Sequence, residues 1–234
     1  MLDVQGLTSG YGKVPVLRGI DFTLKDNECV GILGRNGMGK TTLLRALMGE
    51  LPSWSGTIGK DGTALSACST QDRAKAGLGY VPQGKQIFSN LTVAENLKMG
   101  CIKDFAKANE TIAEIIELLP RLERLLDRQG GSLSGGEQQL LALGRCLCGK
   151  PSVILLDEPT EGIQPSICDE ISDVLNLLKG RSDLSIVLVE QDIEFLWGLC
   201  DRVLAIDKGA FVHEIDPKAP HSDIEAQKFI GIED

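Results

Sequence analysis

Long apolar runs are missing from this chain of 234 residues. No apolar stretch approaches the roughly 18 residues that a membrane-spanning helix needs, so a chain that crosses the bilayer is excluded. Residues 1–5 have neither the basic nor the apolar region of a secretory signal peptide. We therefore expect the protein to be cytoplasmic.

Cysteine and histidine patterns that bind metals are also missing. The seven cysteines are odd in number and irregularly spaced, with no C-x-x-C pair, and the two histidines, His213 and His221, are isolated. Cys146 and Cys148 lie two positions apart in a predicted helix, so they point to different faces and cannot easily share a metal ion. We interpret the cysteines as small buried or half-buried apolar side chains in a reducing compartment.

Positive charge is in deficit, since the formal net charge is −9. A surface that coats nucleic acid is therefore not expected, although a local basic patch is compatible with this balance. The content of 42% apolar and 24% charged residues is ordinary for a globular protein with a sizeable core. The length fits one large domain or one domain with a subdomain.

The sequence does contain a complete phosphate-binding loop of the form G-x-x-x-x-G-K-[ST], at residues 34–41. A short apolar run at 29–33 predicts a buried strand before it, and residues 42–48 predict a helix after it. Glycines let backbone amides converge on phosphate oxygens, and the helix dipole adds positive charge. Lys40 is placed to reach the β- and γ-phosphates, and the Thr41 hydroxyl to bind Mg²⁺. An accidental Gly-rich turn would not explain the strand and helix around it.

The order of the predicted elements indicates an α/β fold. The first third is rich in strands, predicted at 2–7, 20–24 and 30–33, in a hairpin around 59–62, and at 76–81. The last third alternates strands and helices, which is typical of a parallel sheet flanked by helices. These elements are predicted at 153–156, 167–178, 185–189, 193–199, 203–206 and 211–214.

The middle of the chain, from about residue 90 to residue 150, is predicted to be a helical insert. Thr92 and Glu95 form a capping box, which predicts the start of a helix. Apolar residues at 112, 115, 116 and 119 recur at helical spacing and end at Pro120. We expect one domain over residues 1–234, with an α/β core and β subdomain at about 1–89 and 151–234 and a helical subdomain between them.

A second chemical motif is the apolar run at 153–156, which ends in Asp157 and Glu158. Such a run predicts a central strand that delivers two carboxylates to the edge of the sheet where ligands bind. Asp157 is then placed to hold Mg²⁺ and Glu158 to polarise the attacking water. A strand end with two solvated acids is the alternative, which the phosphate-binding loop makes much weaker.

A third motif is a glycine-rich helix start at residues 133–138. Ser134 and Glu137 fit the capping-box template, so the bland interpretation is a well-capped helix. However, Gly135 and Gly136 would each lower helix propensity by roughly 1 kcal/mol relative to alanine. Exposed amides at the positive end of a helix dipole explain these glycines better, because they let a second phosphate approach closely.

Together these motifs resemble the ATP-binding subunit of an ABC transporter over almost the whole chain. Residues 34–41 match the family's phosphate loop, residues 133–137 its signature loop, with Glu137 where glutamine is commoner, and residues 153–158 its magnesium-and-base strand. Gln83 matches the glutamine that senses Mg²⁺ and the membrane partner. Tyr11 stands where the family has an aromatic residue that stacks on adenine, although it could also be an ordinary turn residue.

The resemblance implies an ATPase with a P-loop NTPase core, an N-terminal antiparallel β subdomain and a helical insert. ATP would contact Tyr11, Gly34, Arg35, Asn36, Gly37, Met38, Gly39, Lys40, Thr41 and Thr42, and Ser134, Gly135, Gly136 and Glu137 of a second subunit. Mg²⁺ would be held by Thr41, Gln83 and Asp157, and catalysis would fall to Glu158 and Gln191.

Two departures from the family pattern point to one branch of it. Gln191 replaces the usual switch histidine, and Gln164 replaces the usual aspartate of the dimer-contact loop. Both departures resemble the ATPases of importers for branched-chain amino acids, urea and short amides. Gln83-Gly84 after Pro82 favours the urea or amide side. Gln191 can donate a hydrogen bond to a γ-phosphate oxygen but cannot carry a proton, which leaves the sensing of that phosphate open.

The partners follow from the resemblance. Two ATP-binding subunits, identical or homologous, would stack head to tail, and membrane permease subunits would bind beside Gln83, with a solute-binding protein acting indirectly. Residues 86–91 offer apolar side chains for a permease helix, or else belong to the subdomain core. The chain would lie on the inner face of the membrane, and no nucleic-acid partner is expected.

Two other classes remain open. A soluble ABC-type ATPase acting on ribosomes or DNA usually carries two such domains or a long coiled-coil insert, and this chain has neither. A non-catalytic scaffold would have degenerate motifs, whereas the lysine, the threonine and both acids are present.

Overall fold

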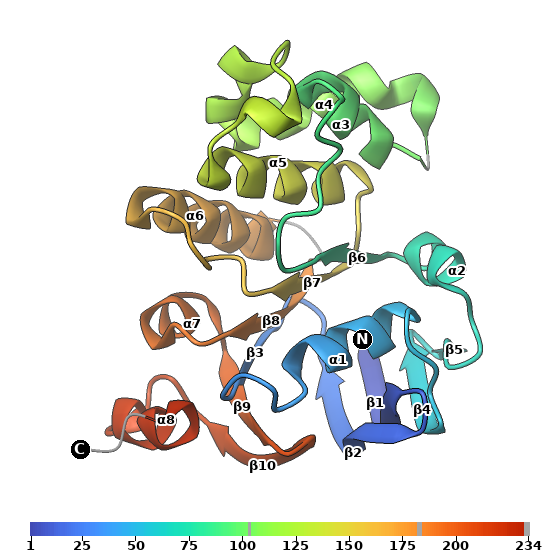
Figure 1. The fold of residues 1–234 in the computed structure, drawn as a ribbon, viewed down its shortest axis with the longest axis vertical. Coiled ribbons are helices and arrows are strands. Elements are labelled where there is room, and N and C mark those ends of the chain that lie inside the picture. Colours follow the sequence, from blue (N-terminus) through green and yellow to red (C-terminus); the bar gives the residue numbers. More distant parts are fainter. Residues whose placement is uncertain (103, 182–183, 232–234) are drawn as a thin grey trace.

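The chain builds two β-sheets with helices around them (Figure 1). In the computed structural model, residues 1–102, 104–181 and 184–231 are described. The six-stranded sheet crosses the middle of the molecule, and the four-stranded sheet lies beside it near the N-terminus. The α/β class with an N-terminal antiparallel sheet is therefore confirmed.

The four-stranded sheet has the order β2-β1-β4-β5 and is antiparallel throughout. Its strands are β1 (Leu2–Tyr11), β2 (Val14–Leu24), β4 (Ser55–Lys60) and β5 (Thr63–Ala64). The predicted hairpin is confirmed, because Asp61 and Gly62 form its turn with φ of 51° and 78°. Two positive φ values are what a two-residue hairpin turn of this hand requires.

The six-stranded sheet has the order β10-β9-β3-β8-β7-β6 and is parallel except between β9 and β10. Its strands are β3 (Cys29–Leu33), β6 (Leu78–Val81), β7 (Val153–Asp157), β8 (Ser185–Glu190), β9 (Arg202–Asp207) and β10 (Ala210–Ile215). Every residue of β3, β7 and β8 is buried. Parallel strands that are covered on both faces have continuous apolar runs in their sequence, which is why these three strands could be predicted.

The two faces of this sheet belong to two separate cores. Val153 and Leu155 of β7 pack with α1 (Lys40–Met48) and with the four-stranded sheet. Ile154 and Leu156, which point the other way, pack with α6 (Pro165–Arg181), α7 (Ile193–Leu199) and the helical part of the chain. The α1 helix is thereby held between the two sheets, which fixes the loop that precedes it (Figure 1).

The helical part is built from α3 (Val93–Gly100), α4 (Ala108–Leu118) and α5 (Gly135–Cys148). Three 3₁₀ turns connect them, at Phe105–Lys107, Pro120–Leu125 and Gly130–Ser132. The capping box at the start of α3 is present, with Thr92 N donating to Glu95 at 2.8 Å and Glu95 N to Thr92 at 3.1 Å. We retain the division of the chain at about residues 90 and 150 as a proposal.

Some elements differ from the predictions. The first two strands are longer than expected, residues 76 and 77 precede β6 rather than belong to it, and α2 (Thr70–Lys75) and α8 (Ser222–Ile230) were not predicted. α2 buries only Arg73 among its six residues, and α8 buries only Ser222 and Ala226. Neither helix therefore has the apolar stripe on which sequence prediction depends.

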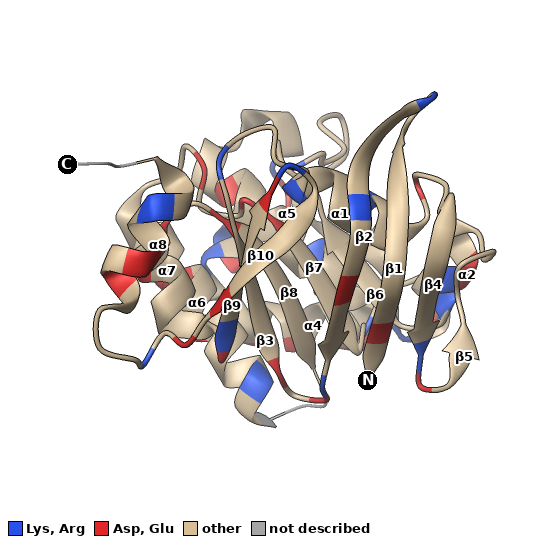
Figure 2. Cartoon of the chain, turned by 90° about the horizontal axis from the view of Figure 1, so that it is seen from below, with Lys and Arg blue, Asp and Glu red and all other residues tan. Residues whose placement is uncertain are grey.

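The seven cysteines are all free and buried or half-buried, as predicted. No helix in the described ranges is long and apolar enough to cross a membrane. Viewed from below, acidic and basic residues are interspersed over the strands and helices (Figure 2).

Candidate nucleotide-binding site

The phosphate-binding loop connects the end of β3 to the start of α1. Gly37 and Gly39 have φ of 82° and 109°, in the left-handed region that glycine adopts without strain. No side chain caps α1, and the amides of Lys40, Thr41 and Thr42 have no acceptor within the described part of the chain. Unpaired amides at the positive end of a helix dipole favour an anion at this position.

Lys40 lies across this loop with its side chain buried. Its Nζ donates to the carbonyl oxygens of Gly34 at 2.7 Å and Arg35 at 3.3 Å, and it lies 3.2 Å from Glu158 Oε1. Two of the three donors of the ammonium are thus used in hydrogen bonds, and the Glu158 carboxylate faces the same charge as an ion pair. The positive charge is therefore fixed at the mouth of the loop, close to the buried acid at the end of β7.

Asp157 ends β7 with no exposed surface. Thr41 Oγ1 donates to its Oδ1 at 3.0 Å, and the Tyr80 hydroxyl donates to its Oδ2 at 3.1 Å. Burial raises the pKa of Asp157 to about 6, although both hydrogen bonds favour the ionised form. Burial, and then the charge of Asp157, raise the pKa of the Tyr80 hydroxyl as well, so that it stays a donor.

The donors around Asp157 suit a hard divalent cation. Thr41 offers a hydroxyl, Asp157 a carboxylate and Gln83 an amide oxygen, and Mg²⁺ prefers such oxygen ligands. Among the described residues no group of three or more His, Cys, Asp and Glu could hold a metal alone. One carboxylate with one hydroxyl fits a cation that takes its remaining ligands from water and from nucleotide phosphates.

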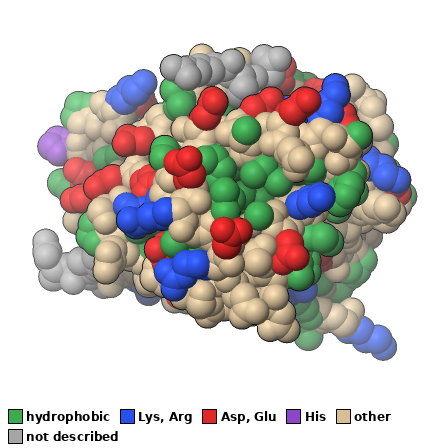
Figure 3. Space-filling model, turned by 90° about the horizontal axis from the view of Figure 1, so that it is seen from above, with side chains coloured by type: hydrophobic (Ala, Val, Ile, Leu, Met, Phe, Trp, Pro, Cys, Tyr) green, Lys and Arg blue, Asp and Glu red, His purple; other side chains and the backbone are tan. Residues whose placement is uncertain are grey.

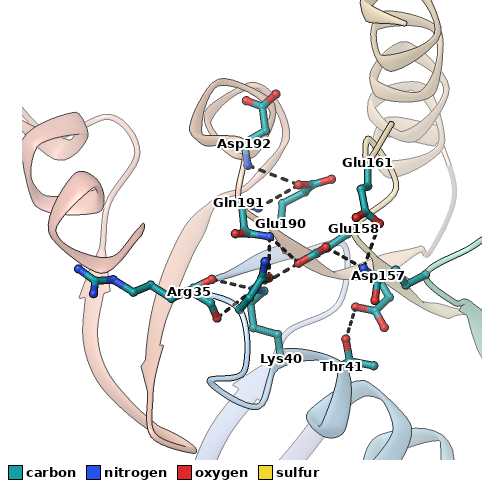
Figure 4. A network of polar contacts seen from close by, with 12 residues as sticks. Arg35, Lys40, Thr41, Asp157, Glu158, Glu161, Glu190, Gln191 and Asp192 are labelled. Atoms are coloured by element: carbon teal, nitrogen blue, oxygen red, sulfur yellow. Dashed lines mark hydrogen bonds and ion pairs between the residues drawn. The ribbon is translucent and has the colours of Figure 1, made fainter. Parts of the chain in front are cut away.

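Glu158 follows Asp157 in a strained conformation, with φ of 46°. Gln83 Nε2 donates to its Oε2 at 3.1 Å, and Gln191 Nε2 donates to its Oε1 at 2.9 Å (Figure 4). Gln191 Nε2 also lies 3.0 Å from Asn36 Oδ1 in the phosphate-binding loop. A non-glycine residue in this backbone region persists only where its surroundings hold it, which is common at functional sites.

These groups surround one open cavity of about 290 Å³. Eight of the predicted site residues line it: Asn36, Gly37, Gly39, Lys40, Thr41, Thr42, Gln83 and Glu158. Asp157 joins this group through Thr41, and Gln191 through Asn36 and Glu158. The structure therefore brings together residues that are up to 155 positions apart in the sequence.

Arg35 and Met38 belong to the same loop, but their side chains line another cavity of about 590 Å³ beside β9, β10 and α8. Figure 4 shows Arg35 pointing away from Lys40 and Glu158. At the end of α8, a Cβ on Gly231 would lie 2.6 Å from the Arg35 Nε. A role of these two residues in nucleotide binding would therefore be a role of their backbone.

The predicted second phosphate site lies outside the cavity. The capping box at the start of α5 is present, with Ser134 N donating to Glu137 Oε2 at 2.8 Å. This bond to a backbone amide lowers the pKa of Glu137. Gly136 is buried, and a Cβ there would lie 2.9 Å from Ile167, so this glycine also has a packing reason that the sequence did not reveal.

Tyr11 lies at the end of β1, outside the cavity, with 45% of its surface exposed. The Arg45 guanidinium lies 5.7 Å from the centre of its ring, and Arg45 Nη1 donates to its hydroxyl at 3.3 Å. An exposed ring face held by a cation can accept another planar group, so stacking on adenine stays a prediction.

The sequence did not reveal the part that Tyr80, Thr160 and Glu190 play at this edge of the sheet. Tyr80 binds Asp157, and Glu190 binds Thr160 with two hydrogen bonds to one carboxylate oxygen, at 2.9 and 2.5 Å. The sequence signal was slight: Tyr80 and Glu190 each lie at or near the end of an apolar run, where parallel strands deliver side chains to the ligand edge.

Comparison with known proteins agrees with this geometry. The sequence profile described as "ABC transporter" matches residues 17–161. The chain is 36% identical to the high-affinity branched-chain amino acid transport ATP-binding protein BraG of Pseudomonas aeruginosa, over 91% of each chain. It is 33% identical to a probable branched-chain amino acid transport ATP-binding protein, LivF, of Archaeoglobus fulgidus, over 89% of each. It is 31% identical to the lipopolysaccharide export system ATP-binding protein LptB of Haemophilus influenzae, over 97% of this chain and 95% of that one.

Solved structures share the fold. CbiO1 of Clostridium perfringens, described as part of an ABC transporter complex, has a TM-score of 0.82 at 27% identity, and the match covers 97% of this chain and 91% of that one. A dimeric ATP-binding cassette bound to ADP and Pi has a TM-score of 0.85 at 23% identity, over 94% of this chain and all of that one. The chain therefore belongs to the ABC transporter family, as an ATP-binding cassette that hydrolyses ATP.

Proposed function

We propose that this ATP-binding subunit energises the import of a small polar solute, with branched-chain amino acids as the solute class. The observation that carries the ATPase part of this proposal is the connected site beside the phosphate-binding loop, where Lys40 and Glu158 line one cavity and Gln191 is hydrogen-bonded to Glu158. The relatives named for branched-chain amino acid transport support the solute class.

In this proposal the triphosphate replaces the internal partners of the site. Lys40 leaves the carbonyl oxygens of Gly34 and Arg35 and binds phosphate oxygens, together with the amides at the start of α1. Bound Mg²⁺, held by Thr41, Asp157 and Gln83, would neutralise phosphate charge. Glu158 then orients the attacking water and accepts its proton, while Gln191 holds Glu158 by a hydrogen bond.

The cavity of one chain is incomplete with respect to the predicted ATP contacts. Ser134 is exposed, and the signature residues Ser134, Gly135, Gly136 and Glu137 are absent from the cavity lining. We infer that two ATP-binding subunits stack head to tail, so that the start of α5 from one covers ATP held by the other. A solved cassette of the same fold is dimeric, which supports the association of two subunits.

Membrane permease subunits are proposed to bind beside Gln83, at residues 86–91 and the adjoining helical part of the chain, so that the subunit lies on the inner face of the membrane. Phe88 is 46% exposed and packs under the Arg145 guanidinium, 5.0 Å from its ring centre. Met99, Ile102 and Phe105, at and just after the end of α3, are exposed as well. The view from above shows hydrophobic side chains gathered across the middle of one face of the molecule, with charged residues around them (Figure 3).

A second candidate function is the export of a lipid such as lipopolysaccharide, because relatives with that name match most of the chain. Both functions use the same nucleotide chemistry. They differ in the membrane subunits, which would select either a small polar solute or an amphipathic lipid. Urea and short amides remain further solutes within the import proposal.

The test is reconstitution with the membrane subunits that co-purify with the tagged chain. Proteoliposomes holding the complex, ATP and the matching solute-binding protein are offered labelled leucine, urea or acetamide. We expect ATP-dependent uptake of leucine that Glu158→Gln abolishes. Uptake of urea or acetamide instead would correct the solute class, whereas extraction of lipopolysaccharide without uptake of any solute would overturn import.

A further inference from the structure

The last residue of β8, Glu190, is a buried carboxylate for which the catalytic scheme above has no use. Its exposed fraction is 3%, and no cation forms an ion pair with it among the described residues. Burying an ionised carboxylate without a counter-ion is costly unless hydrogen bonds stabilise the charge. Its hydrogen bonds therefore indicate what the carboxylate does.

Those bonds join two segments that both emerge at the nucleotide site. Glu190 Oε1 accepts from the Thr160 amide at 2.9 Å and from the Thr160 hydroxyl at 2.5 Å. Its Oε2 accepts from the amide of Gln191 at 2.9 Å and, more weakly, from that of Asp192 at 3.4 Å (Figure 4). All four partners are donors, which suits an ionised carboxylate that can only accept.

The position of this contact explains why a side chain is needed there. The backbone ladder between β7 and β8 ends where Asp157 pairs with Val189, and one further bond joins the Glu158 amide to the Val189 carbonyl at 2.9 Å. Beyond that point the chain turns away through Glu158, with φ of 46°. The Glu190 carboxylate continues the connection between the two strands after the backbone can no longer do so.

Glu158 and Gln191 flank this connection, one on each side. Glu158 lies two residues before Thr160, and Gln191 directly follows Glu190. The hydrogen bond from Gln191 Nε2 to Glu158 Oε1, at 2.9 Å, therefore depends on how these two segments are aligned. Small misplacements of a catalytic group can cost large factors in rate, because the reacting geometry is narrow.

We propose that Glu190 is a positioning residue for ATP hydrolysis, which clamps Thr160 to the Gln191 segment and so aligns Gln191 with Glu158. The proposal rests on the roles proposed above for Glu158 and Gln191, but not on the solute. Glu190 does not touch the nucleotide cavity and acts through its neighbours. Thr160 also begins the segment that leads to Gln164, so the clamp would transmit movement of that segment to the site.

The test compares four single variants and one double variant of the full chain, assayed for ATP hydrolysis and for binding of a fluorescent ATP analogue in the same complex as the wild type. Glu190→Gln keeps the shape but places an amide group against backbone donors. Thr160→Val removes the hydroxyl donor at nearly constant volume, and Thr160→Ser restores it. Glu28→Gln is the matched control, because Glu28 is a little-exposed carboxylate that binds Arg202 at 2.8 Å, outside the nucleotide cavity.

We expect Glu190→Gln to lower kcat by about tenfold or more while nucleotide affinity changes by no more than about twofold. Thr160→Val should lower kcat in the same way, and Thr160→Ser should restore most of it. The double variant of Glu190→Gln and Thr160→Val should be no worse than Glu190→Gln alone by more than about twofold, because both remove one clamp. Glu28→Gln should lower Tm without this loss of kcat.

Three outcomes would overturn the proposal: a wild-type kcat in Thr160→Val, additive losses in the double variant, or losses of kcat that follow Tm in all variants alike. If Glu190→Gln does not fold, the comparison of Thr160→Val with Thr160→Ser decides alone. Failure of the proposed catalytic roles would be seen separately, as wild-type hydrolysis in Glu158→Gln. Failure of the import proposal would leave these hydrolysis data unchanged.

Discussion

At the scale of single residues, the site is a set of buried charged groups that satisfy one another. Lys40 keeps 5% of its surface exposed and Asp157 none. Burying either charge without partners would cost free energy, and each has oxygen or hydroxyl partners within 3.3 Å. Because these partners are the groups that a nucleotide would displace or share, ligand binding and charge burial are coupled here.

Replacing Lys40 by alanine should weaken nucleotide binding strongly. The change removes a desolvated, charge-assisted contact to phosphate, worth about 1.5–3 kcal/mol, or roughly a tenfold to hundredfold loss of affinity. Isothermal titration with ATP measures it. Lys75→Ala, which removes an exposed lysine from α2, is the control and should bind as the wild type does. Unchanged affinity in Lys40→Ala would refute the assignment.

Asp157 should make the stability of the nucleotide-free protein depend on pH. Its pKa rises from the ordinary 3.8 to about 6 on folding, because of burial. A raised pKa means that the folded state binds the proton more tightly, so this stabilisation is present at low pH and is lost as the pH rises through about 6. Asp157→Asn, which mimics the protonated form, should therefore be more stable than the wild type above pH 6.

The expected gain is on the order of 1–3 kcal/mol at pH 7.5, from about two units of pKa, and it should shrink toward pH 4. Urea denaturation at several pH values measures it. Asp173→Asn, on the exposed face of α6, controls for the loss of one negative charge. A stability difference that stays constant across this range would mean that burial does not perturb Asp157.

Much of the site could be predicted at this scale because its residues lie in short, continuous motifs. The loop around Lys40 and the pair Asp157 and Glu158 each carry their chemistry in a few adjacent positions. The contact of Tyr80 with Asp157 joins residues 77 positions apart, and that of Glu190 with Thr160 joins residues 30 apart. Neither pair forms a local pattern, so only the arrangement of strands reveals them.

At the scale of elements, local hydrogen bonds set the starts of two helices in the helical part of the chain. The starts of α3 and α5 carry capping boxes, which the sequence could predict because the motif spans four residues. The end of α1 is different, since its last carbonyl groups are bound by Arg73 from α2. Arg73 Nη1 donates to the carbonyl oxygens of Ala46 and Leu47, both at 2.8 Å.

Replacing Arg73 by methionine should therefore destabilise the fold. Arg73 is 1% exposed, and it also donates to the carbonyl oxygens of Ser66 and Cys68. Methionine would take away the side-chain donors to the carbonyl oxygens of Leu47, Ser66 and Cys68, whereas that of Ala46 keeps the Gly49 amide as a donor. It would also remove a cation from the negative end of a helix, at a total cost of about 2–4 kcal/mol.

Chemical denaturation of the nucleotide-free chain measures this loss, and Arg124→Met, at an exposed arginine, is the control. If both variants were equally stable, Arg73 would not hold the end of α1. The contact of Arg73 with the end of α1 could not be predicted, because α2 has no apolar stripe and an arginine in a polar segment is usually solvated.

At the scale of the whole molecule, the two cores separately fix the phosphate-binding loop and the proposed second half of the ATP site. The phosphate-binding loop depends on α1, which packs between the sheets. The glycine-rich start of α5 belongs to the other core, with the helices on the far face of the six-stranded sheet. The sequence predicted both motifs and the α/β order, and the resemblance implied that the second motif acts on ATP held by another subunit, but the two cores that hold the motifs apart could not be predicted. That separation follows from the crossover of the chain, which local patterns do not encode.

Because one chain does not place the start of α5 in its own cavity, hydrolysis and association should be linked. Glu158→Gln keeps the shape of the site and its ability to bind ATP, but removes the proposed base, so hydrolysis should fall by about 10²-fold or more. Bound ATP should then persist, and the variant should accumulate as a dimer, measured by light scattering after gel filtration with Mg·ATP. Glu170→Gln is the control: it removes a half-buried carboxylate of α6 that binds Arg121 at 2.8 Å, away from the cavity, and should hydrolyse ATP and elute as the wild type does. Turnover of Glu158→Gln at the wild-type rate would show that Glu158 is not the base. A monomer with ATP bound and not hydrolysed would instead refute the proposal that a second subunit closes the site.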